Sequence, residues 1–183
     1  MLKFPFLSGV TRNSRKRSSF RTEDLEARAL LSTFYVNGVG GTNQNGSQES
    51  PFGTIREGIE AALQNPGDDE VVIMPKATGP YSTPITLVPG FSDNQIQGYT
   101  VFNGNLTIRG GGDSPDDVVI QAFGDRAYVD APIAVTISNL TINQSGRHGI
   151  LYRSQQPLTV ENVHVTIHPN TTGIIVQGAE ITV

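Results

Sequence analysis

Hydrophobic and polar residues alternate along the C-terminal third of the chain, and this alternation repeats at a fixed offset. Residues 135–142 align with residues 158–165 at an offset of 23 positions, and the same offset leads from residue 158 to residue 181. Successive side chains of a strand point to opposite faces, so the apolar residues of each copy share one face. A period in the low twenties is typical of one solenoid coil, and coils stack about 4.8 Å apart. The residues predicted to point inward and stack on one another are Val135, Ile137, Leu140 and Ile142 in the first copy, and Leu158, Val160, Val163 and Val165 in the second.

An asparagine occupies the same position in both copies, between two runs of alternating residues. These are Asn139 and Asn162. Asparagine tolerates the left-handed backbone conformation that a tight turn between strands requires. Side chains stacked one repeat apart can also join their amides by a hydrogen bond. We therefore predict a turn at each position and a structural ladder formed by Asn139 and Asn162.

The N-terminal part of the chain has the pattern of a strand, a loop and a helix. A short strand is expected at residues 33–37, followed by a loop rich in Gly, Asn and Ser at residues 38–48. An apolar stripe with helical spacing predicts a helix over residues 54–63. Thr54 and Glu57 have the spacing of a capping box, and the run from Asn65 to Asp68 stops the helix. Gly58 weakens this helix by roughly 1 kcal/mol relative to Ala, so packing must stabilise it.

Short apolar runs predict further strands at residues 70–75, 84–88, 105–108 and 118–120. A β-sandwich would explain the alternation equally well, but it would explain neither the fixed offset nor the early helix. We therefore expect an all-β fold, a right-handed parallel β-helix (a solenoid) from about Val71 onward. The short helix would close its N-terminal end, and the solenoid would be incomplete at its C-terminus.

Five segments near the N-terminus strengthen this expectation by their order and spacing. They resemble the opening of pectin-lyase-like proteins, in which a strand and a helix plug the open end of a β-solenoid. The resemblance implies the fold but not the chemistry, because that superfamily holds lyases, hydrolases, epimerases and non-catalytic adhesins. The usual turn before Tyr81 is altered by residues 76–80, so a bulge is expected there. The five segments are Phe34-Tyr35-Val36, Pro51-Phe52-Gly53-Thr54-Ile55, Pro66-Gly67-Asp68, Val71-Val72-Ile73 and Gly79-Pro80-Tyr81.

The first 32 residues have a different character from the rest of the chain. Residues 1–28 contain seven Lys or Arg and three Asp or Glu, a balance of +4, whereas the remaining residues contain six and fourteen, a balance of -8. The apolar run at residues 4–10 is too short for a transmembrane span. Residues 24–32 resemble the L-E-x-R-x-L-L-S element that precedes the first extracellular domain of large bacterial surface proteins. We interpret residues 1–32 as a basic export leader and residues 33–183 as one domain, secreted or at the cell surface of a bacterial envelope.

Composition narrows the classes of partner. The acidic body argues against nucleic acid, which requires a basic face. The chain has no Cys, which excludes disulfides and thiolate metal sites. Carboxylates in two clusters could bind Ca²⁺: residues 68–70, and Asp113, Asp116 and Asp117. Because both clusters have ordinary turn sequences, we interpret them as solvated turns and keep the second only as a weak candidate metal site.

No catalytic set can be assigned from the sequence. A polysaccharide lyase requires an Arg or Lys base that faces a carboxylate-bound cation. No acidic cluster recurs one repeat away from any arginine of the repeat region, and no carboxylate pairs at a repeat offset with any histidine. His164 in particular is predicted to lie on the surface. The residues considered are Arg109, Arg126, Arg147, Arg153, His148, His164 and His168.

Two hypotheses about function remain. The first is a non-catalytic protein that binds carbohydrate or serves as an adhesive or structural element, because Thr, Asn, Gln and Ser on its solvent faces suit sugar hydroxyls. The second is the N-terminal part of a lyase or glycoside hydrolase acting on acidic polysaccharide, with its active residues beyond Val183. No cofactor is expected, apart from Ca²⁺ at the weak candidate site of Asp113, Asp116 and Asp117. A solenoid that stopped at Val183 would expose an unpaired apolar edge, so self-association through that edge is also expected.

Overall fold

A computed structural model describes residues 31–83, 85–87, 104–121, 127–129, 133–143, 148–166, 169, 172–178 and 180–183. Most of the expected leader, residues 1–30, lies outside these ranges. Ser32, which was assigned to the leader, is the first residue of strand β1 and pairs with Asp69.

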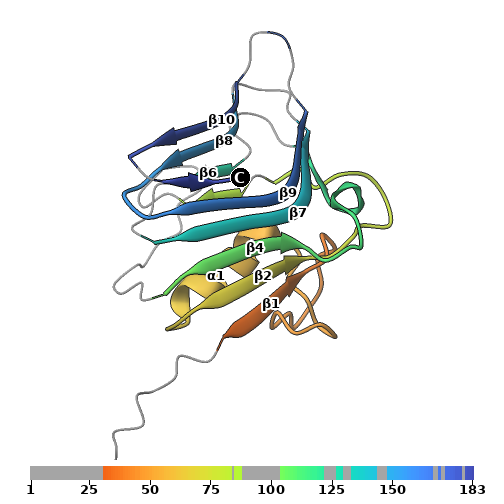
Figure 1. The fold of residues 1–183 in the computed structure, drawn as a ribbon. Coiled ribbons are helices and arrows are strands. Elements are labelled where there is room, and N and C mark those ends of the chain that lie inside the picture. Colours follow the sequence, from red (N-terminus) through yellow and green to blue (C-terminus); the bar gives the residue numbers. More distant parts are fainter. Residues whose placement is uncertain are drawn as a thin grey trace, which may run out of the picture.

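Most of the strands join in one sheet in which every pair is parallel. Six of them are neighbours in the order β1, β2, β4, β7, β9 and β11, and β5 pairs with the far part of β7 to make a seven-stranded sheet. Figure 1 shows this order as a progression of colour from orange to blue. The bounds of the strands are β1 Ser32–Val36, β2 Asp69–Ile73, β4 Leu106–Gly110, β5 Val119–Ile120, β7 Val135–Asn143, β9 Leu158–Thr166 and β11 Ile181–Thr182.

A second, four-stranded parallel sheet has the order β10, β8, β6 and β3. Its strands alternate along the chain with those of the first sheet, so the crossover from β2 to β4 passes through β3, and the crossover from β7 to β9 passes through β8. From β2 onward, strands of this second sheet therefore lie in the crossovers between neighbouring strands of the first, whereas helix α1 lies between β1 and β2. The bounds are β3 Ile85–Leu87, β6 Ala127–Val129, β8 His148–Arg153 and β10 Thr172–Gln177.

Helix α1 (Ile55–Gln64) lies between β1 and β2 in the sequence and confirms the predicted helix. Thr54 is its N-cap: Glu57 N donates to Thr54 Oγ1 at 3.2 Å, and Thr54 N donates to Glu57 Oε2 at 2.9 Å. The apolar face of α1 enters the same core as the inward side chains of both sheets, so α1 and the four-stranded sheet lie on one side of the larger sheet. Among the described residues, no α-helix or second sheet packs on the opposite side of the larger sheet, and most of its outward side chains are partly exposed.

The register of the repeat confirms the offset of 23 residues. Val135 pairs with Leu158 and Ile142 with Val165, and Leu158 pairs in turn with Ile181. Each copy was expected to consist of two strands with a turn between them. Instead, β7 and β9 are continuous nine-residue strands that bend at the asparagine, and their pairing keeps the same register on both sides of it, from Ser138 with Glu161 to Leu140 with Val163.

The expected fold class, an all-β right-handed parallel β-helix with an incomplete C-terminus, is corrected by these observations. The described residues form a mixed α/β structure, a seven-stranded all-parallel sheet with one α-helix packed on it. The helix is part of the core, because Ile55, Ile59 and Ala62 are fully buried. The two halves of each repeat belong to a single sheet. We therefore describe the fold as a parallel sheet of α/β type and not as a solenoid.

Candidate functional site

The solvent side of the seven-stranded sheet carries a row of threonines that crosses six strands. The side chains that alternate with the row, such as Leu106 and Ile108, are fully buried, so the row itself points outward. Its members are half-exposed on the first five strands and exposed on the last. The pairing register places them directly beside one another, and we call them the threonine row: Thr33, Glu70, Thr107, Thr136, Thr159 and Thr182.

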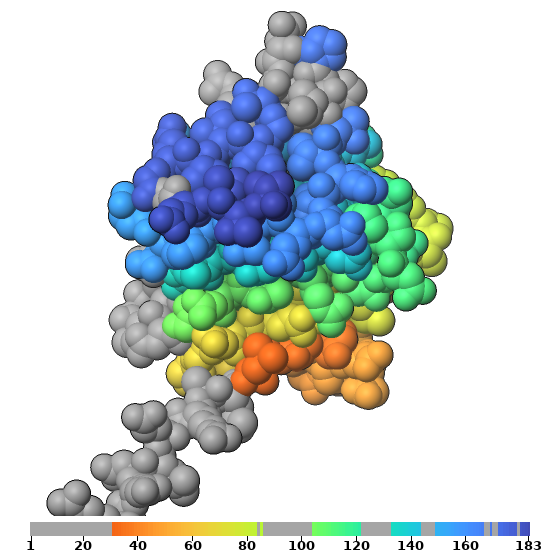
Figure 2. Space-filling view, in the orientation of Figure 1, coloured from red at the N-terminus to blue at the C-terminus, as the bar shows by residue number. Residues whose placement is uncertain are grey.

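A second outward row lies two residues further along each strand. It is more varied than the threonine row, with an aromatic ring on β1 and charged side chains on β4 and β9. Val72 in this row is only 3% exposed. The second row consists of Tyr35, Val72, Arg109, Ser138 and Glu161. In Figure 2, drawn in the orientation of Figure 1, the surface is banded in sequence order from orange to blue.

An ion pair between β4 and β2 joins the two rows, close to the edge of the sheet that β1 forms. Arg109 Nε lies 2.6 Å from Glu70 Oε1, and both side chains are partly exposed. Thr33 Oγ1 donates to the other carboxylate oxygen, Glu70 Oε2, at 3.3 Å. The only acid of the threonine row is therefore engaged on both of its oxygens by neighbours on β1 and β4. Glu161, at the other end of the second row, is exposed.

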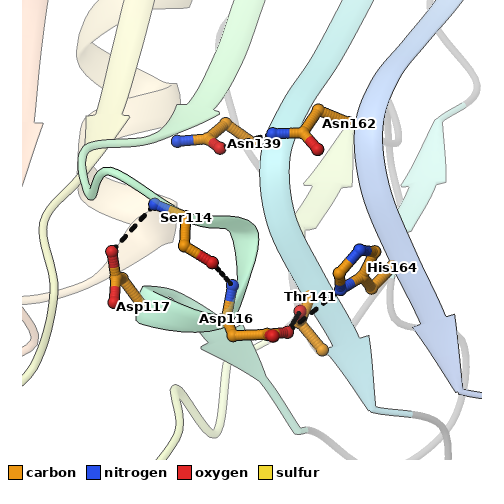
Figure 3. A network of polar contacts seen from close by, with 7 residues as sticks. All are labelled: Ser114, Asp116, Asp117, Asn139, Thr141, Asn162 and His164. Atoms are coloured by element: carbon orange, nitrogen blue, oxygen red, sulfur yellow. Dashed lines mark hydrogen bonds and ion pairs between the residues drawn. The ribbon is translucent and has the colours of Figure 1, made fainter.

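The asparagines lie where β7 and β9 bend away from this face, and the structure places them side by side (Figure 3). Both have left-handed backbones, with φ of 50° at Asn139 and 51° at Asn162. Asn162 Nδ2 donates to Asn139 Oδ1 at 2.8 Å. Asn139 Nδ2 donates in turn to the carbonyls of Gly110 and Gly112, at 3.2 and 2.8 Å. The ladder thus links β9 through β7 to the loop after β4.

Beyond the bend, one side chain of β7 and one of β9 contact the Asp116 carboxylate (Figure 3). Thr141 Oγ1 donates to Asp116 Oδ1 at 2.8 Å, and His164 Nδ1 lies 3.0 Å from the same oxygen. These contacts, Thr141 first and then His164, lower the pKa of the Asp116 carboxyl below its ordinary value. The sequence did not reveal the pair because Asp116 and His164 are 48 positions apart, which is not a repeat offset.

The three candidate calcium ligands do not converge. Asp116 is engaged as described, while Asp117 Oδ2 accepts from Ser114 N at 2.9 Å and completes the capping box of a short 3₁₀ helix, Pro115–Asp117. Asp113 is exposed in the same loop. Across the described ranges, no three acidic, His or Cys side chains are grouped so that they could hold a metal ion.

The other candidate bases are distributed over both sheets. Arg109 belongs to the second row, and Arg153 ends β8 with its own polar interactions. His148 begins β8. Arg126, Arg147 and His168 lie outside the described residues.

A buried carboxyl at the start of β2 was missed by the sequence analysis, which assigned residues 68–70 to a solvated turn. Asp69 is 1% exposed. Its Oδ1 accepts from Asn65 Nδ2 at 2.8 Å, but its Oδ2 is buried without a hydrogen-bond partner. Burial raises the pKa of this carboxyl above its ordinary value. The alternation of β2 could have revealed it, because Asp69 is in phase with the buried Val71 and Ile73 whereas the exposed Asp68 is not.

Comparison of the chain with protein-family models, curated proteins and solved structures finds no match. Within the part of the chain that the structure describes, no helix has the length and apolar character needed to cross a membrane.

Proposed function

We propose that this chain is a non-catalytic carbohydrate-binding protein, whose binding surface is the solvent side of the seven-stranded sheet. The observation that carries the proposal is the threonine row, with five hydroxyls in register on parallel strands. A hydroxyl both donates and accepts hydrogen bonds, which matches the hydroxyls of a sugar. The row therefore offers the same bonding pattern on almost every strand.

The scaffold favours binding because it holds these hydroxyls in place before a ligand arrives. Threonine is branched at Cβ and has few χ1 rotamers, and the strands behind it are fixed by a buried apolar core. Ordering the side chains on binding therefore costs little entropy, and more of the contact energy contributes to affinity. A row of flexible long side chains would lose more of that energy.

The polar groups of the described face support binding more than catalysis. Arg109, the candidate base on this face, is engaged by Glu70 at 2.6 Å. In the group around Asp116, the Thr141 hydroxyl donates to the carboxylate and not to His164. Glycoside hydrolysis uses two carboxyl groups that flank the scissile bond, whereas the contacts of the Asp116 carboxylate in the described residues are with a hydroxyl and an imidazole. The alternative, a lyase or hydrolase for acidic polysaccharide, has correspondingly less support.

One resemblance in the sequence bears on where the protein acts. The element at residues 24–32 resembles export leaders of surface proteins. We accordingly propose that the protein acts in secreted form or at the cell surface.

The test is retention of the full chain on immobilised polysaccharides, neutral and acidic, with the variant Thr136→Val/Thr159→Val beside the wild type. Valine keeps the branched shape and removes only the hydroxyl. We expect the wild type to be retarded by at least one polymer and the double variant to lose at least about tenfold in affinity, equivalent to about 1.4 kcal/mol. Thr166→Val is the matched control, because Thr166 is exposed on the same strand β9 but lies beyond the bend. Equal retention of all three proteins, or release of an unsaturated product that absorbs in the ultraviolet, would contradict the proposal.

A further inference from the structure

We infer that the ligand of this face is an extended neutral polysaccharide that runs along the threonine row, across the strands, with one sugar opposite each strand. This inference rests on the proposed function and names the ligand class and its direction. It follows from three features of the face: its spacing, its charge and the ring at one end.

The spacing of the row sets the direction of the ligand. Neighbouring strands of a sheet lie about 4.8 Å apart, so consecutive members of the row recur at that interval. The row crosses six strands, from β1 to β11, which gives a length of roughly 24 Å at the strand spacing. An extended 1,4-linked polysaccharide advances by a similar distance with each sugar. A chain laid along the row can therefore place one sugar hydroxyl near each threonine, whereas a chain laid along a strand meets the row only once.

The charge of the face selects the ligand class. The two rows contain two carboxylates, Glu70 and Glu161, and one guanidinium, that of Arg109. The guanidinium is paired with Glu70, so Glu161 is the net charge of the face and is exposed. An acidic polymer would bring its carboxylates toward this negative charge. The repulsion between like charges would weaken its binding. A neutral polymer meets no such repulsion.

An aromatic side chain lies at one end of the face. Tyr35 on β1 alternates with the buried Val36 and therefore points outward, and it is half-exposed. Its ring lies one strand from Glu70 and beside the end of the threonine row. Tyrosine has an apolar body and a polar tip, which suits the flat face of a sugar ring. We infer that the terminal sugar of the bound polysaccharide lies against the Tyr35 ring.

The experiment is calorimetric titration of the full chain with neutral 1,4-linked oligosaccharides of two to eight sugars, and with oligogalacturonates of the same lengths. We expect affinity for the neutral series to rise with length up to about six sugars and then to level off, because the row spans six strands. We expect oligogalacturonate to bind at least tenfold more weakly. The variant Glu161→Gln should narrow that difference by raising the affinity for oligogalacturonate.

The outcomes separate this inference from the proposed function. Tighter binding of oligogalacturonate than of the neutral chain would overturn the ligand class, while the carbohydrate-binding function would stand. Affinity that stops rising at two or three sugars would overturn the direction along the row. Absence of binding to every neutral and acidic chain would remove both the inference and the function.

Discussion

At the scale of single residues, Asn139 makes more hydrogen bonds than its partner in the ladder. Its amide group donates to the carbonyls of Gly110, which ends β4, and of Gly112 in the loop that follows, and it accepts from Asn162. The side chain of Asn162 makes one bond, and this residue is exposed. The repeat predicted that these residues would share a turn position, because it aligned them. It did not predict the bonds to Gly110 and Gly112, since these residues lie outside the repeat that the sequence shows.

This difference predicts unequal costs of truncation. Asn162→Ala should lower the free energy of unfolding by about 1 kcal/mol or more through the lost bond and the strained left-handed backbone, and Asn139→Ala by about 2–3 kcal/mol. Urea denaturation of both variants measures this order. Asn162→Gly serves as the control, because glycine accepts the left-handed conformation and isolates the cost of the bond. Equal losses of a few tenths of a kcal/mol for both alanine variants would contradict the ladder.

The buried carboxyl of Asp69 predicts how stability changes with pH. Its folded pKa is raised by burial, so the folded state binds more protons than the unfolded state between the two pKa values. Its contribution to stability is complete below the ordinary carboxyl pKa and is lost as pH rises through the raised value. The variant Asp69→Asn should remove this decline while its amide oxygen still accepts from Asn65. Denaturation from pH 4 to pH 8 tests this, and identical pH profiles for variant and wild type would show that Asp69 does not titrate as described.

At the scale of elements, the sequence showed only those strand pairs that are separated by a constant number of residues. In the larger sheet, β7 with β9 and β9 with β11 pair at an offset of 23 residues, as in Val135 with Leu158. Strands β1, β2 and β4 pair at wider offsets, 37 residues for Thr33 with Glu70 and 29 for Leu106 with Val135. Insertions of unequal length hide these strands from self-comparison. Strands β6, β8 and β10 were not predicted, because the repeat was compared only over the residues that form β7, β9 and β11.

Helix α1 was predicted from local signals, but its packing explains why it contains Gly58. A Cβ at this position would lie 2.6 Å from Val36 Cγ2 and 3.1 Å from Val71 Cγ1, so only glycine allows α1 to approach the sheet this closely. Gly58→Ala gains roughly 1 kcal/mol of helix propensity but overpacks the core, which costs about 1–3 kcal/mol. We expect a net loss of stability of up to about 2 kcal/mol in thermal or urea denaturation.

A second variant distinguishes the clash from other effects of the substitution. A Val36→Ala background removes the closest contact and leaves Val71 Cγ1 at 3.1 Å, so Gly58→Ala should there cost less stability than with Val36 present or gain up to about 1 kcal/mol. The double-mutant cycle measures this coupling. If Gly58→Ala stabilised the protein with Val36 present, the close approach of helix and sheet would be wrong.

At the scale of the whole molecule, the sequence predicted parallel stacking in register but not the fold class. The bend at Asn139 was expected to divide two strands, yet β7 continues through it, and the helix contributes to the core. The threonine row follows from the register of six strands, and only the last three of them repeat at a constant offset in the sequence. Thr33, Glu70 and Thr107 could not be aligned with Thr136 before the pairing was known. The binding face is therefore a property of the assembled sheet.

The central claim is that this face, and not the group around Asp116, receives a carbohydrate. Nuclear magnetic resonance spectra of the labelled chain, recorded during titration with a neutral 1,4-linked hexasaccharide, test it most directly, because each threonine methyl reports its own surroundings. We predict that the methyl signals of Thr107, Thr136 and Thr159 shift together with one dissociation constant, while that of Thr166 does not move. Shifts confined to Thr141 and His164, or no shift at any ligand concentration, would contradict the account.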